Sequence, residues 1–129
     1  MDILAKIFIG IVIAIHLYIV YMEMFAWNSL GRKTFGKLIP KEVFPYTKKL
    51  ANNQGLYNFF LAAGLIWSLL IQDPIWQKNI AIFFLSCVVL AGLYGGITVH
   101  KKIFTFQLVP AGVALLIIYI NESHVVFGN

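Results

Sequence analysis

Four side chains able to bind a proton, a cation or a polar ligand lie within apolar stretches of this sequence. Glu23 follows His16 by seven residues in "HLYIVYMEMFAW", so both lie on one helical face, about 10 Å apart along the axis. Gln54 and Asn58 lie one helical turn apart in "NQGLYNFFLAAGL". A carboxylate accepts hydrogen bonds or binds cations, and a carboxamide both donates and accepts. This combination predicts a polar binding site in otherwise apolar surroundings.

The composition predicts that these surroundings are a lipid bilayer. Of the 129 residues, 60% are hydrophobic and only 12% are charged, whereas a soluble domain carries about 25% charged residues. The formal charge of +5 comes from Lys and Arg residues between apolar runs, where they orient membrane helices. No basic patch with a nucleic-acid-binding motif occurs, so the lipid bilayer, and not nucleic acid, is the expected partner.

Apolar runs predict four spans within one domain of residues 1–129. We place the spans at residues 3–27, 55–71, 75–99 and 103–120. The turns at 72–74 and 100–102 are short, which makes sequential helices antiparallel neighbours. The predicted fold is therefore an all-α, four-helix transmembrane bundle with antiparallel up-down topology. The connection at 28–53 holds four glycines and prolines, which excludes one continuous helix. Its mixture of lysines and apolar residues suits a segment at the headgroup level.

The distribution of positive charge predicts the orientation. Eight of the ten Lys and Arg residues fall in the two connections that share one side: Arg32, Lys33, Lys37, Lys41, Lys48, Lys49, Lys101 and Lys102. Positive charge stays inside, so the loop at 28–53 is expected to be cytoplasmic. Both termini are then outside, and the protein is a multi-pass protein of the cytoplasmic (inner) membrane.

This orientation would bring polar groups of all four helices to one depth, at their cytoplasmic ends. The predicted ligand-binding residues are Glu23, Gln54, Tyr57, Asn58, Tyr94, Thr98 and Gln107. Helical spacing places Val88, Ala91, Gly95 and Thr98 on one face of the third span, and Gln107, Ala111 and Ala114 on one face of the fourth. If these faces point inward, they enclose a polar chamber near the cytoplasmic surface.

The most informative of the polar residues and glycines also have a purely structural interpretation. Glu23 is either a proton-titrating or cation-binding carboxylate, or an interfacial glutamate that reaches water one turn away. His16 either continues a proton path or packs between helices. Gln54 and Asn58 either contact a ligand or join helices through hydrogen bonds. The Gly92-xxx-Gly96 spacing favours close helix packing, with space for a ligand beside Gly95 and Gly96 as the alternative.

Several kinds of site are not expected. The sequence contains no nucleophile–base triad, no HExxH motif and no CxxC motif, and catalytic residues stay unassigned. The three histidines fall at separate depths, and Cys87 is the single cysteine, so neither a metal nor a cofactor is expected.

Three segments resemble one bacterial family of small four-helix membrane proteins of unknown function. They are "HLYIVYMEMFAW", "NQGLYNFFLAAGL" with its QGxYN segment, and "AGLYGGITVHKKIFTFQLVPAGVALL". The resemblance covers nearly the whole chain and implies a four-span inner-membrane protein without an established activity. In size and layout the chain is also loosely similar to DoxX-like four-helix membrane proteins.

Three functions remain open at this point. The first is binding or transport of a small polar or amphipathic molecule through the polar layer, with coupling to protons as an option. The second is a membrane-embedded enzyme that acts on a lipid-soluble substrate, with Glu23 as acid or base. The third is an accessory or assembly protein without a ligand. A bundle this small could also assemble into a homo-oligomer.

Overall fold

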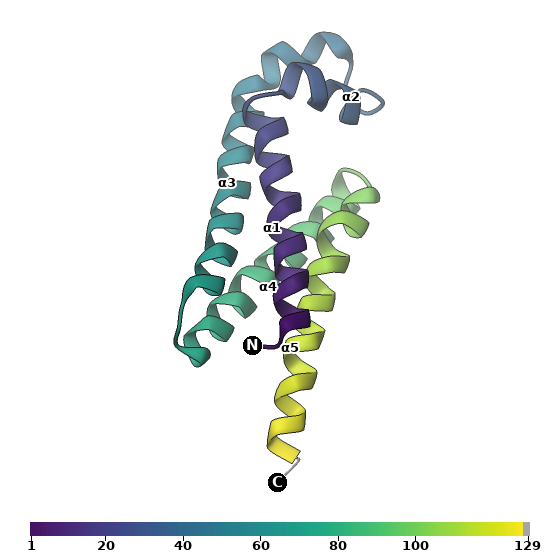
Figure 1. The fold of residues 1–129 in the computed structure, drawn as a ribbon. Coiled ribbons are helices and arrows are strands. Elements are labelled where there is room, and N and C mark those ends of the chain that lie inside the picture. Colours follow the sequence, from purple (N-terminus) through teal and green to yellow (C-terminus); the bar gives the residue numbers. More distant parts are fainter. Residues whose placement is uncertain (128–129) are drawn as a thin grey trace. The chain divides into compact units, whose positions relative to one another are not determined.

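Helices are the only regular secondary structure in the described part of the chain. The computed structural model describes the backbone of residues 1–127 and the side chains of residues 1–121, and no strand occurs among them (Figure 1). Two of the short elements, η1 and η3, are π-helices, and η2 is a 3₁₀-helix. The elements are α1 (Ile3–Met24), η1 (Trp27–Gly31), α2 (Arg32–Phe35), η2 (Lys41–Val43), α3 (Phe44–Leu70), α4 (Pro74–Thr98), η3 (Phe104–Leu108) and α5 (Val109–Phe127).

Local chemistry explains where the long helices begin. The Asp73 carboxylate accepts hydrogen bonds of 2.9 Å from the backbone N–H groups of Ile75 and Trp76, which caps α4. Pro74 occupies the first turn of α4, where a missing N–H costs no intrahelical hydrogen bond. Pro45 lies in the first turn of α3 for the same reason. Residues 28–43 of the predicted loop are broken into short helices, as their glycines and proline predict, whereas residues 44–53 belong to α3, which begins before the predicted span of 55–71.

Among the described residues, three segments are long and apolar enough to cross a membrane: Ile3–Met24, Pro74–Thr98 and Phe104–Asn121. Helix α3 is long enough, with 27 residues, but it is not among the three. Its first half carries lysines and the amides of residues 52–54, which lower its hydropathy. The all-α class is thus confirmed, while the fourth span and the antiparallel topology stay predictions.

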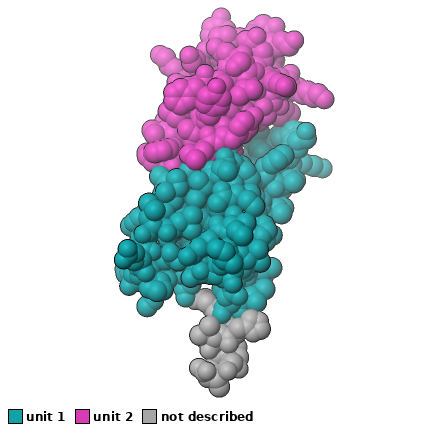
Figure 2. All heavy atoms as spheres, viewed as in Figure 1, with its two compact units in different colours: residues 1–15, 61–129 teal, residues 16–60 magenta. Residues whose placement is uncertain are grey.

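The chain divides into two compact units, and each is described by itself. One comprises residues 1–15 and 61–129, and the other residues 16–60 (Figure 2). The core of the first unit draws buried side chains from α1, α3, α4 and α5. These are Ala5, Ile9, Val12, Ile13, Leu65, Ala81, Leu85, Val88, Ala111, Ala114 and Ile118.

Glycines set the closest helix contacts of the first unit. A Cβ added to Gly92 would lie 2.8 Å from the backbone nitrogen of Leu108, and one added to Gly96 would lie 2.5 Å from the Phe104 ring. Real Cβ atoms do not approach other atoms so closely, so α4 and η3 can pack in this way only without side chains there. The packing interpretation of the Gly92-xxx-Gly96 spacing is confirmed.

The inward face of α4 differs from the predicted one. Gly92 and Gly96 are buried, whereas Ala91 and Thr98 are exposed, so the buried stripe passes one residue away from the predicted face. The two glycines carry no apolar side chain, yet they mark the face because they admit the backbone of η3. For α5 the predicted face is confirmed, since Ala111 and Ala114 are fully buried.

Substitution of Gly92 tests this contact. We expect Gly92→Ala to destabilise the protein by about 1–3 kcal/mol, because the new methyl group meets backbone, which cannot rotate away. Gly112→Ala is the matched control, since a Cβ there meets nothing within 4 Å. The control should be neutral or slightly stabilising, because alanine favours helix. Thermal unfolding in detergent micelles measures both, and equal midpoints would contradict the packing contact.

Candidate functional site

The second unit joins the end of α1 to the beginning of α3 around Trp27. Its indole ring lies 5.2 Å from the Phe44 ring and 5.9 Å from the Phe35 ring, measured between centroids. The indole N–H also donates a hydrogen bond of 3.1 Å to the hydroxyl of Thr47. Trp27, Phe44 and Ala51 form the buried cluster of this unit. This cluster holds the C-terminal end of α1 beside the first turns of α3 (Figure 1).

Glu23 and Asn58, two of the predicted ligand-binding residues, are hydrogen-bonded to each other. The Asn58 side-chain nitrogen donates to a carboxylate oxygen of Glu23 at 2.9 Å and to the backbone carbonyl of Gln54 at 3.2 Å. Both side chains are partly buried. This hydrogen bond holds the Glu23 carboxyl group against α3.

Asn52 makes a second connection between the helices, which the sequence did not reveal. With its amide oriented to match its surroundings, the nitrogen donates to the backbone carbonyls of Glu23 at 3.1 Å and Met24 at 3.2 Å. The last carbonyls of a helix lack intrahelical partners, and the last turn of α1 has no basic side chain to supply them. Asn52 therefore acts as a C-terminal cap provided by another helix. The absence of a basic residue in the last turn of α1 was the only sequence feature that pointed to a cap from elsewhere.

Gly55 makes both connections possible. A Cβ at this position would lie 2.5 Å from Cγ of Met24 and 3.2 Å from Cβ of Glu23. The backbone of α3 therefore approaches α1 directly, within reach of the short asparagine side chains on either side of Gly55 in the sequence.

Two other predicted residues of α3 lie on its outer surface. The Gln54 side chain is exposed, and only its backbone carbonyl joins the connection to Asn58. Tyr57 is 54% exposed, and its ring lies 6.4 Å from the Phe60 ring, between centroids. Within the described part of the chain, neither of these two side chains is hydrogen-bonded to the Glu23 carboxylate.

The remaining ligand-binding candidates belong to the first unit. The Thr98 hydroxyl donates to the backbone carbonyl of Tyr94 at 2.8 Å, and Tyr94 itself is 73% exposed. Gln107 lies within the π-helix η3, a rare element that is frequent at functional sites. A single layer that unites these residues with Glu23 stays a prediction. His16, in the second unit, is almost fully buried, which suits both packing and a proton path.

The Glu23 carboxylate has unused capacity for binding. A carboxylate can accept about four hydrogen bonds, and Asn58 supplies one. The other positions can receive a proton, a cation or a donor group of a ligand. Among the described residues, no three His, Cys, Asp or Glu side chains lie close enough to hold a metal ion.

Fold and site together define a small all-α protein with three helices able to cross a membrane and a carboxylate–amide pair that joins two helices. The chain belongs to the family described as "Protein of unknown function (DUF1304)", which matches residues 10–119. It is 32% identical over 100 residues to "Uncharacterized protein YpaA" of Lactococcus lactis subsp. lactis (strain IL1403), which covers 77% of this chain and 80% of the relative. No solved structure matches it. The predicted family of unknown function is thus confirmed, and the likeness to DoxX-like proteins stays a prediction.

Asn52 gives the sharpest test of the connection between α1 and α3. We expect Asn52→Leu to lower the free energy of unfolding by about 1–3 kcal/mol, because two helix-terminal carbonyls lose their donor. The neighbouring Asn53 is exposed, so Asn53→Leu makes the same chemical change without touching α1. The measurement is the unfolding midpoint of both variants in the same detergent. A stable Asn52→Leu protein would show that the cap contributes nothing.

Proposed function

We propose that the protein is a four-span protein of the inner membrane with an antiparallel, up-down bundle. Two observations support this arrangement. In the three apolar segments, only 17% to 33% of the most hydrophobic stretch is buried inside the protein, so most of this apolar surface needs lipid to cover it. In addition, α3 supplies Leu65 to the core formed with the other three long helices, as a fourth bundle helix would.

The function that this arrangement supports best is binding of a small polar or amphipathic molecule at Glu23, with transport as its extension. The main observation in support of this function is the 2.9 Å hydrogen bond between Asn58 and the partly buried Glu23 carboxylate. A carboxylate in apolar surroundings costs about 2.5–3.5 kcal/mol on insertion scales, a cost that a cationic ligand group offsets. Asn58 holds one acceptor position and leaves the others for the ligand.

The other residues have assigned roles in this proposal. Within the second unit, Gln54 orients the ligand through a hydrogen bond and Tyr57 forms an aromatic wall. Ligand contacts of Tyr94, Thr98 and Gln107, which lie in the first unit, stay a prediction from the sequence. His16 continues a proton path from Glu23 if binding is coupled to protons. A positively charged ligand gains binding free energy from attraction to the negative carboxylate, whereas a neutral detergent or lipid does not. This difference separates specific binding at Glu23 from general apolar contacts.

One set of contacts favours a second candidate, an accessory or assembly protein without a ligand. Asn52 and Asn58 both fasten α1 to α3, and hydrogen bonds of this kind stabilise membrane bundles by about 0.6 kcal/mol on average. In that case the Glu23 carboxylate serves only as the acceptor for Asn58.

Glu23→Gln separates the two candidates. The glutamine oxygen can still accept from Asn58, so the variant should stay folded, while it loses the negative charge. Under the ligand-binding proposal, affinity for a lipophilic cation such as tetraphenylphosphonium should fall at least about tenfold, the equivalent of 1.4 kcal/mol. Calorimetry in detergent micelles measures it. Glu42→Gln is the matched control, because Glu42 is an exposed carboxylate of the same unit.

The possible results distinguish ligand binding from an accessory role. Equal affinity of the two glutamine variants would exclude Glu23 as the cation site. If Asn58→Leu then lowered the unfolding midpoint while Glu23→Gln did not, the accessory role would be the better description.

Reporter fusions test the orientation. A reporter fused after Asn129 should be active outside the cell, and one inserted after Gly36 should be active in the cytoplasm. A cytoplasmic signal at both positions would contradict the four-span arrangement, because the three spans predicted between Gly36 and Asn129 place them on opposite sides of the membrane.

A further inference from the structure

The first unit has a pocket that the Glu23 site does not use. It lies where α4 turns into η3 and has a volume of about 640 Å³. This size falls within the usual range for small-molecule sites, about 300–1,000 Å³. Its lining residues are Gly96, Ile97, Val99, His100, Lys101 and Phe104.

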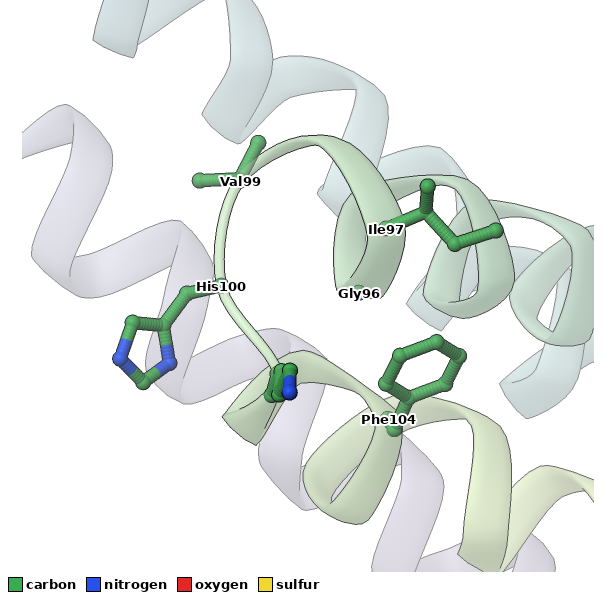
Figure 3. A pocket seen from close by; sticks show the side chains of 6 residues that line it. Gly96, Ile97, Val99, His100 and Phe104 are labelled. Carbon is green, nitrogen blue, oxygen red and sulfur yellow. The ribbon is translucent and has the colours of Figure 1, made fainter.

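The pocket has an apolar end and a polar end. The Phe104 ring lies beneath the end of α4, close to Gly96 and Ile97, whereas Val99 and His100 project from the other side of the turn (Figure 3). Because Gly96 has no side chain, the Phe104 ring packs directly on the backbone of α4. The apolar end therefore suits a hydrocarbon chain.

The polar end carries donors and positive charge. The Nδ1 atom of His100 accepts a hydrogen bond of 3.1 Å from the backbone N–H of Lys102, so a proton on the ring resides at Nε2, which then donates. Lys101 is exposed and is among the residues that line the same pocket. No acidic residue occurs from Pro74 to Asn121, so neither helix beside the turn offers a carboxylate to neutralise Lys101.

We propose that this pocket binds an anionic phospholipid. The phosphate accepts from His100 Nε2 and Lys101 Nζ, and the first part of an acyl chain lies against Ile97 and Phe104. A water-soluble phosphate would gain only the polar half of this pocket, and a zwitterionic lipid would bring an ammonium group toward Lys101. The turn between α4 and η3 is predicted to lie at the cytoplasmic surface, where anionic headgroups attract basic residues.

The test compares two adjacent lysines of equal charge. Purified protein in neutral detergent receives phosphatidylglycerol, phosphatidylcholine or inorganic phosphate. Bound lipid is counted by native mass spectrometry, and the unfolding midpoint is recorded. We expect the wild type to retain phosphatidylglycerol and to gain stability only from it. Lys101→Gln should lose about fivefold in retention, the effect of one basic residue at an anionic surface. Lys102→Gln, whose side chain does not line the pocket, should match the wild type within twofold.

A second pair of variants tests the pocket volume without changing charge. Ile97→Trp fills the apolar end and should also displace the lipid, whereas Leu93→Trp lies one turn earlier, outside the lining, and should not. Glu23→Gln should leave lipid retention unchanged, so failure at one site is distinguishable from failure at the other. Equal losses for Lys101→Gln and Lys102→Gln would overturn the proposal in favour of general charge attraction. Unchanged retention in Lys101→Gln and Ile97→Trp, or stabilisation by inorganic phosphate alone, would also overturn it.

Discussion

The contact between α1 and α3 in the second unit depends on one constraint. The backbone carbonyls at the end of a helix need hydrogen-bond donors when their surroundings are apolar. Helix α1 ends at Met24 without a basic side chain in its last turn, so its final carbonyls depend on another part of the chain. Asn52 of α3 supplies the donor, and Asn58 supplies another to the Glu23 carboxylate. An unpaired buried polar group costs about 1–3 kcal/mol, so these amides offset a penalty that apolar packing cannot. The amides that lower the hydropathy of α3 thus stabilise its contact with α1.

Hydrogen bonds of this kind require close helices, and glycine provides the closeness in both units. Gly55 brings the backbone of α3 against Met24, and Gly92 brings α4 against the backbone of η3. Membrane helices gain little from the hydrophobic effect when they associate, because lipid is as apolar as leucine. In the proposed membrane arrangement, association depends on close van der Waals contact and on polar pairs, which fits glycine at both junctions and asparagine at the junction of α1 and α3.

The two proposed sites differ in charge and in the kind of support they have. The Glu23 site is a carboxylate held by an amide, with capacity left for a cation, and among the described residues its side-chain hydrogen bond comes from Asn58 of α3. The pocket beside η3 is open to the surface and has basic residues at one end and apolar residues at the other. Each site is formed by the residues of a different unit. The proposal for one site therefore does not depend on the proposal for the other.

The apolar runs of the sequence determined the helical class and the approximate positions of α1, α4 and α5, because such runs act locally, whereas α3 begins at Phe44, before its predicted span of 55–71. They also indicated Glu23 and Asn58 as polar residues at similar depth. Only the tertiary structure decided that Asn52 caps α1, that Tyr57 is exposed, and that the buried face of α4 passes through Gly92. A helix that is apolar on all sides carries almost no periodic signal for the face that meets protein, because lipid and core accept the same residues. Close backbone approach decides the face instead, and that property belongs to pairs of helices.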